Sequence, residues 1–554
     1  MVCLGASSDM AAYTIDVVGD VFTSFSSATI RYGAPGMGKS VHLHETGERF
    51  YKRGSKIIGL NDDEGRFEYL FYAFPGRDDM WKHFCQTQLH WGNVKVSDWL
   101  LIKEGKKTFE DVFPWKPETY PVECYIPALP GKYSYPSVFK PFTISFSSLS
   151  LYEFKILLGK ITTKQSRTVD LAWSRMKVNK VGKTFENFIQ ILKGFISNRK
   201  IQAEDMEYNI CESEDGLDLL IKIEKVWQLG LISTKEDPYN LNLARIMWDT
   251  KTISGFSFFN ISDGNVRYVL YGWLLRRIRD VRNKALLGKV MFPELCLLIH
   301  ELQDIAPARG QEETYSVEGQ RISTAQLVKL AKKPRDIKVR IHADTQNPLS
   351  LWKPLRESFS TTFIFRCDRA VVDSIRALTY FDDATYIGLQ RSKTGVHCVK
   401  SAPTGGRDYS GVNFPMLSLP PTSMCKTPDD LFRVEWERYG GEFTDWDFEV
   451  PETLITIKKA RSKEKKALST RQQKVYMVYA RFVLKVITKN PGIYIKDILL
   501  HPDMCQELEL TSTEMYEVCK FLAAKNMIEK RQEGTYTACY ANSDNCPVED
   551  LGHG

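Results

Sequence analysis

The sequence predicts an α/β fold in which helices cover a mainly parallel β-sheet. Three observations predict this class. Residues 33–40 read GAPGMGKS and match G-x-x-x-x-G-K-[ST], the pattern of a phosphate-binding loop between a strand and a helix. Strand, loop, helix and strand characters follow one another over residues 28–60, which is how a parallel sheet begins. Further along, the mostly apolar run Glu294–Glu301 is typical of a strand buried on both faces.

The first predicted strand, Ala28–Tyr32, leads directly into the loop, whose glycines let successive N–H groups point at a phosphate chain. Lys39 is expected to reach the β- and γ-phosphates, and the Ser40 hydroxyl to ligate Mg²⁺. A helix over Ser40–Tyr51 adds a dipole that favours anions at its N-terminus. The alternative interpretation is an ordinary glycine-rich turn. We expect ATP and Mg²⁺ as ligands, with the nucleotide bound by Gly33, Ala34, Pro35, Gly36, Met37, Gly38, Lys39 and Ser40.

A second strand, Ser55–Leu60, ends in the turn residues 61–63 and completes the first β–loop–α–β unit. Loops and short strands are expected over Phe113–Pro141, which is rich in proline and aromatic residues. Apolar residues at helical spacing then predict helices over Thr184–Ser197 and Leu217–Leu231. The chain therefore divides into an N-terminal part of the core at 1–112 and a mixed or helical insertion at 113–264.

The sheet is expected to resume after the insertion, over residues 265–455. An arginine-rich amphipathic helix comes first, followed by the apolar strand, a second helix and two further strands. The predicted elements are the helices Asn265–Arg282 and Ser323–Lys332 and the strands Glu294–Glu301, Val339–Ala343 and Thr361–Phe365.

A separate small domain is expected at the C-terminus. The lysine-rich segment 456–470 is typical of a linker, and residues 471–545 resemble a winged helix, with three helices followed by a hairpin. Such domains usually place the third helix in a DNA groove. This helix carries both acidic and basic residues, so a protein–protein module stays open as the alternative. The predicted elements are the helices Arg471–Thr488, Tyr494–Leu500 and Thr511–Lys525 and the hairpin Asn526–Tyr540.

Hydrolysis of a triphosphate requires a group that activates water and a group that responds to the γ-phosphate. Glu301 follows the buried strand, so we predict that it polarises the attacking water. Gln346 stands at the tip of a later strand, where its amide is expected to sense the γ-phosphate. The predicted catalytic residues are thus Glu301, Lys39 and Gln346. The competing interpretations are an exposed strand-end carboxylate and an exposed loop amide.

Three stretches after the insertion are informative together: LLIHELQDIAP at 297–307, DTQNP at 344–348 and TTFIFR at 361–366. With the phosphate loop, they resemble the HerA/FtsK branch of the RecA-like ATPases. In that branch an acidic pair opens a stretch similar to DEAH/Q-x-(I/L)-A-P, and a Thr-Gln pair follows one strand later. The resemblance covers residues 28–75 and 265–400. It implies a RecA-like fold and a hexameric ring that translocates double-stranded DNA, with a nuclease or another DNA-processing protein as a partner.

One residue departs from this pattern. His300 stands where the branch usually has a carboxylate that holds the water shell of the metal. A neutral imidazole accepts a hydrogen bond from a metal-bound water but supplies no charge. We therefore expect either slow hydrolysis or compensation by another acid, for which Asp62, Asp63 and Asp304 are candidates. Candidates for an arginine finger are Arg356 and Arg366.

Composition restricts the remaining choices. The net charge of +7 mildly favours an anionic partner, and twelve cysteines without a C-x-x-C pair predict a reducing, cytoplasmic setting. No apolar run approaches membrane-spanning length, so no membrane contact is expected. The leading hypothesis is an ATP-driven DNA motor that forms a homo-oligomeric ring. The alternatives are an initiator or switch ATPase of the AAA+ type and an interaction protein that binds nucleotide with little turnover.

Overall fold

A computed structural model of the 554-residue chain describes two compact units, Met1–Ile455 and Thr456–Gly554. The described residues are 28–61, 95–108, 111, 118–178, 182–197, 200–203, 206–209, 213–233, 237–310, 317–332, 336–373, 383–391, 394–401, 416–417, 436–438, 440–451, 483–498, 515, 518–520, 522–523, 528–533 and 536–541.

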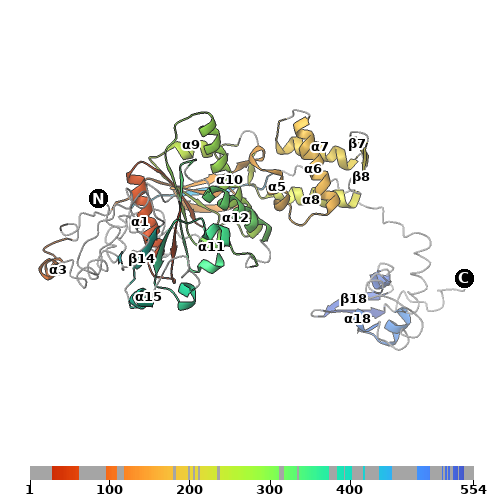
Figure 1. Ribbon diagram of the computed structural model, residues 1–554. Helices are drawn as coiled ribbons and strands as arrows, with labels where there is room; N and C mark the ends of the chain where they lie inside the picture. Colours follow the sequence, from red (N-terminus) through yellow and green to blue (C-terminus); the bar gives the residue numbers. More distant parts are fainter. Residues whose placement is uncertain are drawn as a thin grey trace, which may run out of the picture. The chain divides into compact units, whose positions relative to one another are not determined.

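A β-sheet forms the centre of the first unit (Figure 1). Its ten described strands have the order β15-β14-β13-β1-β12-β11-β2-β10-β3-β5. All neighbours from β13 to β5 pair in parallel, whereas β14 and β15 pair antiparallel at one edge. The mainly parallel sheet predicted from the sequence is confirmed. The strands are β1 (Ala28–Tyr32), β2 (Lys56–Asn61), β3 (Val122–Pro127), β5 (Phe139–Phe142), β10 (Ile253–Ser257), β11 (Leu295–Ile299), β12 (Val339–Thr345), β13 (Thr361–Phe365), β14 (Val396–Ser401) and β15 (Met416–Leu417).

The order of the five central strands decides which loops meet. Counted along the chain among themselves, β13-β1-β12-β11-β2 have the order 5-1-4-3-2, so β12 separates β1 from β11. In the ladders, Tyr32 lies opposite Thr345 and Ile299 lies opposite Ala343. Because these strands are parallel, their carboxyl ends meet at one edge of the sheet. The loop after β1 and the residues that end β11 and β12 therefore lie together.

Alternate residues of the central strands face two different cores. Leu295, Leu297 and Ile299 of β11 belong to a large core that includes apolar residues of α10 and α12. Cys296 and Leu298 belong to a second core with apolar residues of α1. Helix α1 thus covers one face of the sheet, and α10 and α12 cover the other (Figure 1). The three helices are α1 (Lys39–Lys52), α10 (Gly264–Leu287) and α12 (Val317–Lys332).

Helices α10 and α12 approach each other closely at two glycines. A Cβ at Gly272 would lie 2.2 Å from Cγ2 of Ile322, and a Cβ at Gly319 would lie 3.0 Å from the carbonyl oxygen of Asn265. Asp263 caps α10, because its side chain accepts the N–H groups of the second and third helical residues. Both helices are longer than the sequence predicts. The added start of α12 packs against α10 at Gly319, whereas Leu286 and Leu287 at the end of α10 are exposed.

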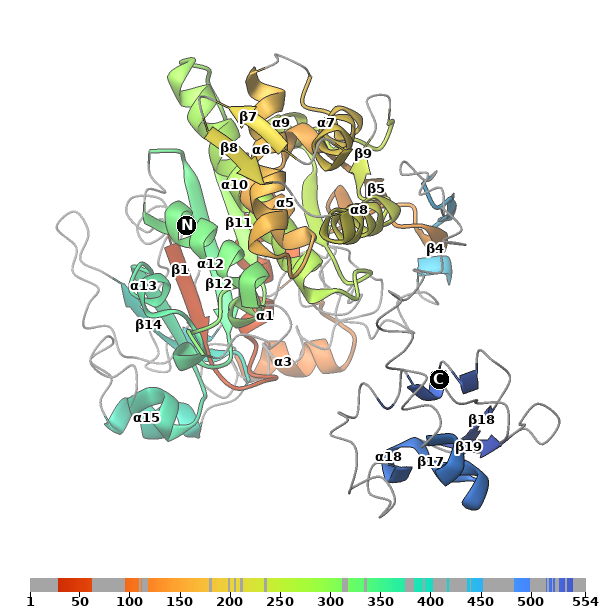
Figure 2. The ribbon, with the colours of Figure 1, turned by 90° about the vertical axis from the view of Figure 1, so that its right-hand side faces the viewer.

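A helical bundle is inserted between β5 and β10, within the range predicted as an insertion. Helix α5 packs against α10 and α12, and Figure 2 shows α5 beside α10. Arg276 of α10 fixes this contact by donating to both carboxylate oxygens of Glu153, at 2.7 Å each. Strands β3, β5 and β10 come from the same range of the chain but extend the sheet. The bundle helices are α5 (Leu151–Leu157), α6 (Thr163–Val178), α7 (Phe185–Ser197) and α8 (Ser213–Gln228).

The second unit contains a small antiparallel sheet in the order β17-β19-β18. Strands β18 and β19 pair where the sequence predicts a hairpin. Helical residues at 483–489 and around Met515–Leu522 supply an apolar core with Ile498, Ile528 and Cys539. The bounds of its elements are β17 (Ile493–Tyr494), α18 (Ile495–Ile498), β18 (Ile528–Glu533) and β19 (Tyr536–Ala541).

The remaining described elements are short. Strand β4 (Gly131–Pro136) pairs antiparallel with β16 (Phe443–Phe448), which brings the end of the first unit back to the sheet edge near β3 and β5. Six cysteines in the described ranges are buried free thiols. Among the described helices, none has the length and apolar character required to cross a membrane. The other elements are α3 (Val96–Lys103), β6 (Ile144–Ser145), β7 (Lys200–Ala203), β8 (Met206–Asn209), β9 (Ile232–Ser233), α9 (Leu243–Trp248), α11 (Leu302–Ile305), α13 (Lys353–Arg356) and α15 (Asp383–Gln390).

Candidate nucleotide site

The predicted phosphate loop connects β1 to α1 and requires its glycines. Gly36 and Gly38 have φ angles of 73° and 93°, in the left-handed region that favours glycine. A Cβ at Gly33 would lie 2.6 Å from the Cβ of Phe365, and a Cβ at Gly38 would lie 3.1 Å from the Cα of Gly395. The backbone conformation therefore disfavours a side chain at Gly36 and Gly38, and close neighbours leave too little space for one at Gly33 and Gly38.

Neighbouring strands hold the loop in place. The N–H of Ala34 donates to the carbonyl oxygen of Arg366 after β13, and the N–H of Gly395 before β14 donates to the carbonyl oxygen of Met37. Lys39 is buried, and its Nζ donates to the carbonyl oxygen of Ala34 at 3.0 Å, so its ammonium lies over the loop. Burial lowers the pKa of Lys39, although the nearby carboxylates of Asp344 and Glu301 oppose this shift.

The N-terminus of α1 supplies backbone donors to the same place. The helix is 14 residues long, and its N-cap, Gly38, has no side chain to accept the first N–H groups. No acidic residue lies in its first turn. The amides and the helix dipole therefore favour an anion at the loop, as in other phosphate-binding helices.

Glu301 is placed by an unusual backbone turn at the end of β11. Its φ of 43° and ψ of 60° put it in the left-handed region, which turns the chain from the strand into α11. Its Oε1 accepts from Nε2 of Gln346 at 3.0 Å, and its Oε2 accepts from Nε2 of Gln303 at 2.7 Å. The hydroxyl of Thr345 in turn donates to Oε1 of Gln303. Two amides thus fix the orientation of this carboxylate.

Asp344, at the end of β12, links the loop to Glu301. Its carboxylate is fully buried; Oδ2 accepts from the Ser40 hydroxyl at 2.9 Å, and Oδ1 accepts from the N–H of Glu301 at 2.8 Å. Nδ1 of His300 lies 3.4 Å from Oδ2. Burial alone would raise the pKa of Asp344, but His300, the Glu301 N–H and Lys39 together lower it below the ordinary value. The ionised form is therefore favoured.

The structure brings the predicted site residues together. Lys39 and Ser40 from α1, Glu301 after β11 and Gln346 after β12 all lie at the carboxyl edge of the sheet. Gln346 follows the end of β12, and its amide donates to the Glu301 carboxylate.

The candidate compensating acids and the candidate arginine fingers lie in different places. Asp62 and Asp63 lie outside the described residues, and Asp304 lies in α11, where its N–H donates to the Glu301 carbonyl oxygen. The guanidinium of Arg356 donates to the carbonyl oxygen of Pro348 at 3.3 Å, and the backbone of Arg366 contacts the loop. The arginine finger stays unassigned.

Sequence reasoning missed Asp344 and Gln303. The signal for Asp344 was an acid at the end of a predicted strand, immediately before the Thr-Gln pair. The strand was predicted to end at Ala343, whereas β12 continues to Thr345 because β1 pairs with it up to that residue. The acid therefore belongs to the sheet rather than to the loop that follows it.

The residues present fit a magnesium ion. Mg²⁺ prefers oxygen ligands and is usually held by one or two carboxylates together with substrate phosphates. The Ser40 hydroxyl and the Asp344 carboxylate are such groups, joined by a hydrogen bond beside the phosphate loop. Within the described ranges, no cluster of three or more histidine, cysteine or acidic side chains forms a metal site by itself.

A buried polar layer lies behind the loop, between α1 and the sheet. The Arg31 guanidinium donates to Nδ1 of His42 at 3.1 Å and to the hydroxyl of Thr46 at 2.7 Å. The His42 ring stacks on His397 with 4.8 Å between centroids. Burial lowers the pKa of Arg31 to about 9 and the pKa of His397 to about 4. Arg31 makes β1 less apolar in sequence than a buried central strand usually is, and this layer supplies its buried polar partners.

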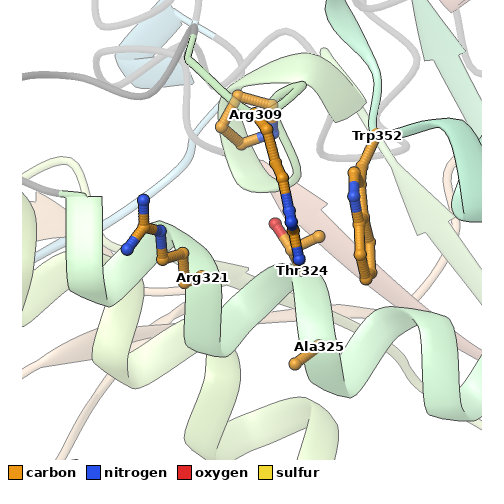
Figure 3. A pocket seen from close by; sticks show the side chains of 6 residues that line it. Arg309, Arg321, Thr324, Ala325 and Trp352 are labelled. Carbon is orange, nitrogen blue, oxygen red and sulfur yellow. The ribbon is translucent and has the colours of Figure 1, made fainter.

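A separate pocket of 410 Å³ lies beyond α11 (Figure 3). The guanidinium of Arg309 lies over the ring of Trp352, 5.8 Å from its centroid. None of the predicted site residues lines this pocket, so it is distinct from the phosphate loop. Its lining residues are Pro307, Arg309, Arg321, Thr324, Ala325 and Trp352.

Comparisons with known proteins give distant structural similarities. No protein-family model and no curated protein matches the chain. Among solved structures, it is similar to VirB4 of Thermoanaerobacter pseudethanolicus at 12% identity, over 76% of this chain and 98% of that one, with a TM-score of 0.46. It is also similar to the plasmid coupling protein TrwB in complex with ADP and Mg²⁺, at 13% identity, over 73% and 81%, with a TM-score of 0.34.

A third similar structure covers less of the chain. The genome packaging NTPase B204 from Sulfolobus turreted icosahedral virus 2, in complex with AMP, matches at 10% identity over 33% of this chain and 73% of that one, with a TM-score of 0.21. The fold itself is assigned from this chain's own strand order and loop. Its central strand order and the glycine-rich loop between β1 and α1 are those of a RecA-like P-loop NTPase fold.

Proposed function

We propose that the chain is an ATP-driven motor of the HerA/FtsK type that translocates double-stranded DNA as a homohexameric ring. The observation that carries the ATPase proposal is the position of Glu301. Its carboxylate is held by the amides of Gln346 and Gln303, and its backbone is tied through Asp344 to Ser40 of the phosphate loop. A held carboxylate at the edge that carries the phosphate loop is the arrangement that hydrolysis requires.

Each residue then has a defined part in the reaction. The loop amides and Lys39 bind the phosphate chain, and the Ser40 hydroxyl ligates the metal. Bound Mg²⁺ neutralises charge on the phosphate oxygens. Glu301 accepts a hydrogen bond from the attacking water and orients it. Gln346 contacts Glu301 and stands where its amide responds to the γ-phosphate.

The DNA-binding part of the proposal rests on the second unit. We interpret it as a winged helix, because a short strand, a hairpin and helical segments surround one small apolar core. The pairing of β18 with β19, and of β19 with the short strand β17, supports this interpretation. A protein-binding role is the alternative, and a salt-dependent DNA affinity distinguishes the two.

Two other functions fit less well. An AAA+ switch usually carries its acidic motif within about a hundred residues of the loop, whereas Glu301 follows Lys39 by 262 positions. A nucleotide-binding protein without turnover was suggested by His300 in place of an acid. The hydrogen bond between Ser40 and Asp344 argues against that function, because it puts an acid beside the phosphate loop.

The experiment that tests the proposal is ATP hydrolysis measured with and without double-stranded DNA, together with the mass of the assembly. We expect turnover that DNA stimulates and a mass near six chains. The matched control is Lys39→Ala, which removes the phosphate-binding ammonium and should abolish turnover. Undiminished hydrolysis by that variant would contradict the assignment of the site. ATP turnover that DNA does not stimulate would contradict the proposal of a DNA motor.

A further inference from the structure

We propose that Asp344 is the acid that holds the water shell of nucleotide-bound Mg²⁺, and that this role has moved from β11 to the neighbouring strand β12. The inference rests on the proposed nucleotide-binding function. It assigns the metal acid that His300 does not supply at the end of β11. It assigns to Asp344 the role for which the sequence alone offered Asp62, Asp63 and Asp304.

The contact with Ser40 is the first argument. A hydroxyl has one proton and two lone pairs. Ser40 donates its proton to Oδ2 of Asp344 at 2.9 Å, which leaves its lone pairs free to ligate a cation. In P-loop enzymes the metal is held by the loop Ser or Thr together with an acidic residue from a nearby strand. Asp344 is the carboxylate that shares a hydrogen bond with the loop serine here.

The strand register is the second argument. Ile299 of β11 lies opposite Ala343 of β12, so His300 and Asp344 are the next residues of two adjacent parallel strands. Adjacent strands are only about 4.8 Å apart. Strand β12 also pairs directly with β1, which leads into the loop. An acid on β12 therefore reaches nearly the same point as an acid on β11, from a strand that is closer to the loop.

His300 acquires a different role in this arrangement. Its Nδ1 lies 3.4 Å from Oδ2 of Asp344, so the imidazole is a partner of the carboxylate rather than a substitute for it. The N–H of Glu301 holds the other oxygen at 2.8 Å. We assign His300 as a positioning residue, because its imidazole lies beside the carboxylate of the acid.

The test measures metal binding rather than turnover. A fluorescent ADP analogue is bound to the full chain in EDTA, and the affinity of the complex for Mn²⁺ is then measured by electron paramagnetic resonance. Asp344→Asn keeps the shape and an oxygen acceptor for the Glu301 N–H. We expect unchanged nucleotide binding in EDTA and a Mn²⁺ affinity weakened about 10- to 100-fold.

Two further variants keep the result decisive. His300→Asp combined with Asp344→Asn places the acid back on β11 and should regain most of the Mn²⁺ affinity. The matched control Asp304→Asn removes the acid on α11 and should leave Mn²⁺ affinity unchanged. Wild-type Mn²⁺ affinity in Asp344→Asn would overturn the inference, as would a loss of equal size in Asp304→Asn.

Failure of the proposed function and failure of the Asp344 assignment give different results in these measurements. If the unmodified chain binds neither nucleotide nor Mn²⁺ with nucleotide, the P-loop function itself fails and this inference fails with it. If the unmodified chain binds both and Asp344→Asn behaves the same, only the assignment of the acid is wrong.

Discussion

At the scale of single residues, Glu301 combines a strained backbone with a carboxylate that two amides hold in place. A non-glycine residue in the left-handed region costs of the order of 1–3 kcal/mol and persists only where its surroundings fix it. Here the fixing groups are the Asp344 carboxylate on the N–H and two glutamine amides on the side chain. Sites of this kind are often functional, which supports Glu301 as the group that activates water.

Replacing Glu301 with glutamine tests that role directly. The amide keeps the size of the side chain but is a much weaker base. We expect Glu301→Gln to bind ATP as the unmodified chain does and to hydrolyse it about 100- to 10,000-fold more slowly. Single-turnover hydrolysis and equilibrium ATP binding should be measured on the same preparation. A variant with near-normal turnover would show that another group activates the water.

The buried histidines predict a dependence of stability on pH. Burial lowers the pKa of His397 to about 4, below the ordinary value of 6.5. The unfolded chain therefore takes up a proton as the pH falls below 6.5, whereas the folded chain does not until about pH 4. Stability is lost over that interval, and His397 alone accounts for about 2 kcal/mol between pH 7 and pH 5.

The variant His397→Phe tests this prediction. Phenylalanine keeps an aromatic ring beside His42 and Phe365, whose rings lie 4.8 and 5.0 Å from His397. We expect the decrease in unfolding free energy between pH 7 and pH 5 to be smaller by about 2 kcal/mol. Urea unfolding followed by tryptophan fluorescence measures it. The interval from pH 7 to pH 8 is the control, since the imidazole is mostly neutral there in both states and contributes only about 0.1 kcal/mol.

At the scale of elements, the contact between α10 and α12 decides how the far face of the sheet is covered. Gly272→Ala would place a Cβ 2.2 Å from the Ile322 methyl group, so one helix has to move. We expect a loss of about 1–3 kcal/mol in stability. Gly194→Ala in α7 is the matched control, because no atom lies within 4 Å of its added Cβ. Alanine there should stabilise the helix by about 0.5–1 kcal/mol.

Measuring thermal unfolding of both variants separates close packing from helix propensity. A shortened side chain opposite the glycine, in Gly272→Ala with Ile322→Ala, should recover part of the loss that comes from the clash. If Gly272→Ala is as stable as Gly194→Ala, the two helices are not held at the distance that the structure gives.

Most elements were predictable because their patterns are local. The strands β1 and β13 have the predicted bounds, and α7 begins one residue later than predicted. The start of α12 and the end of β12 were not predictable, since a contact with α10 and pairing with β1 fix them. The sequence assigns β3, β5 and β10 to an insertion. Their residues do not indicate which other strands they pair with, so their place in the main sheet could not be predicted.

At the scale of the whole molecule, the proposed division of labour places nucleotide chemistry in the first unit and DNA binding in the second. Deleting residues from Arg471 onward should weaken binding to double-stranded DNA and reduce the slope of log affinity against log salt, since phosphate contacts release counterions. ATP turnover without DNA should stay unchanged. An unaltered salt slope would instead make the second unit a protein-binding module.

The sequence by itself determined the phosphate loop, the succession of strands and helices, and the two chemical candidates Glu301 and Gln346. These features depend on residue type, spacing and turn chemistry, all of which are local. The order of the strands in the sheet depends on packing between segments hundreds of residues apart. Only the tertiary structure therefore decided that β12 lies between β1 and β11, that Asp344 meets Ser40, and that His300 stands beside an acid instead of replacing one.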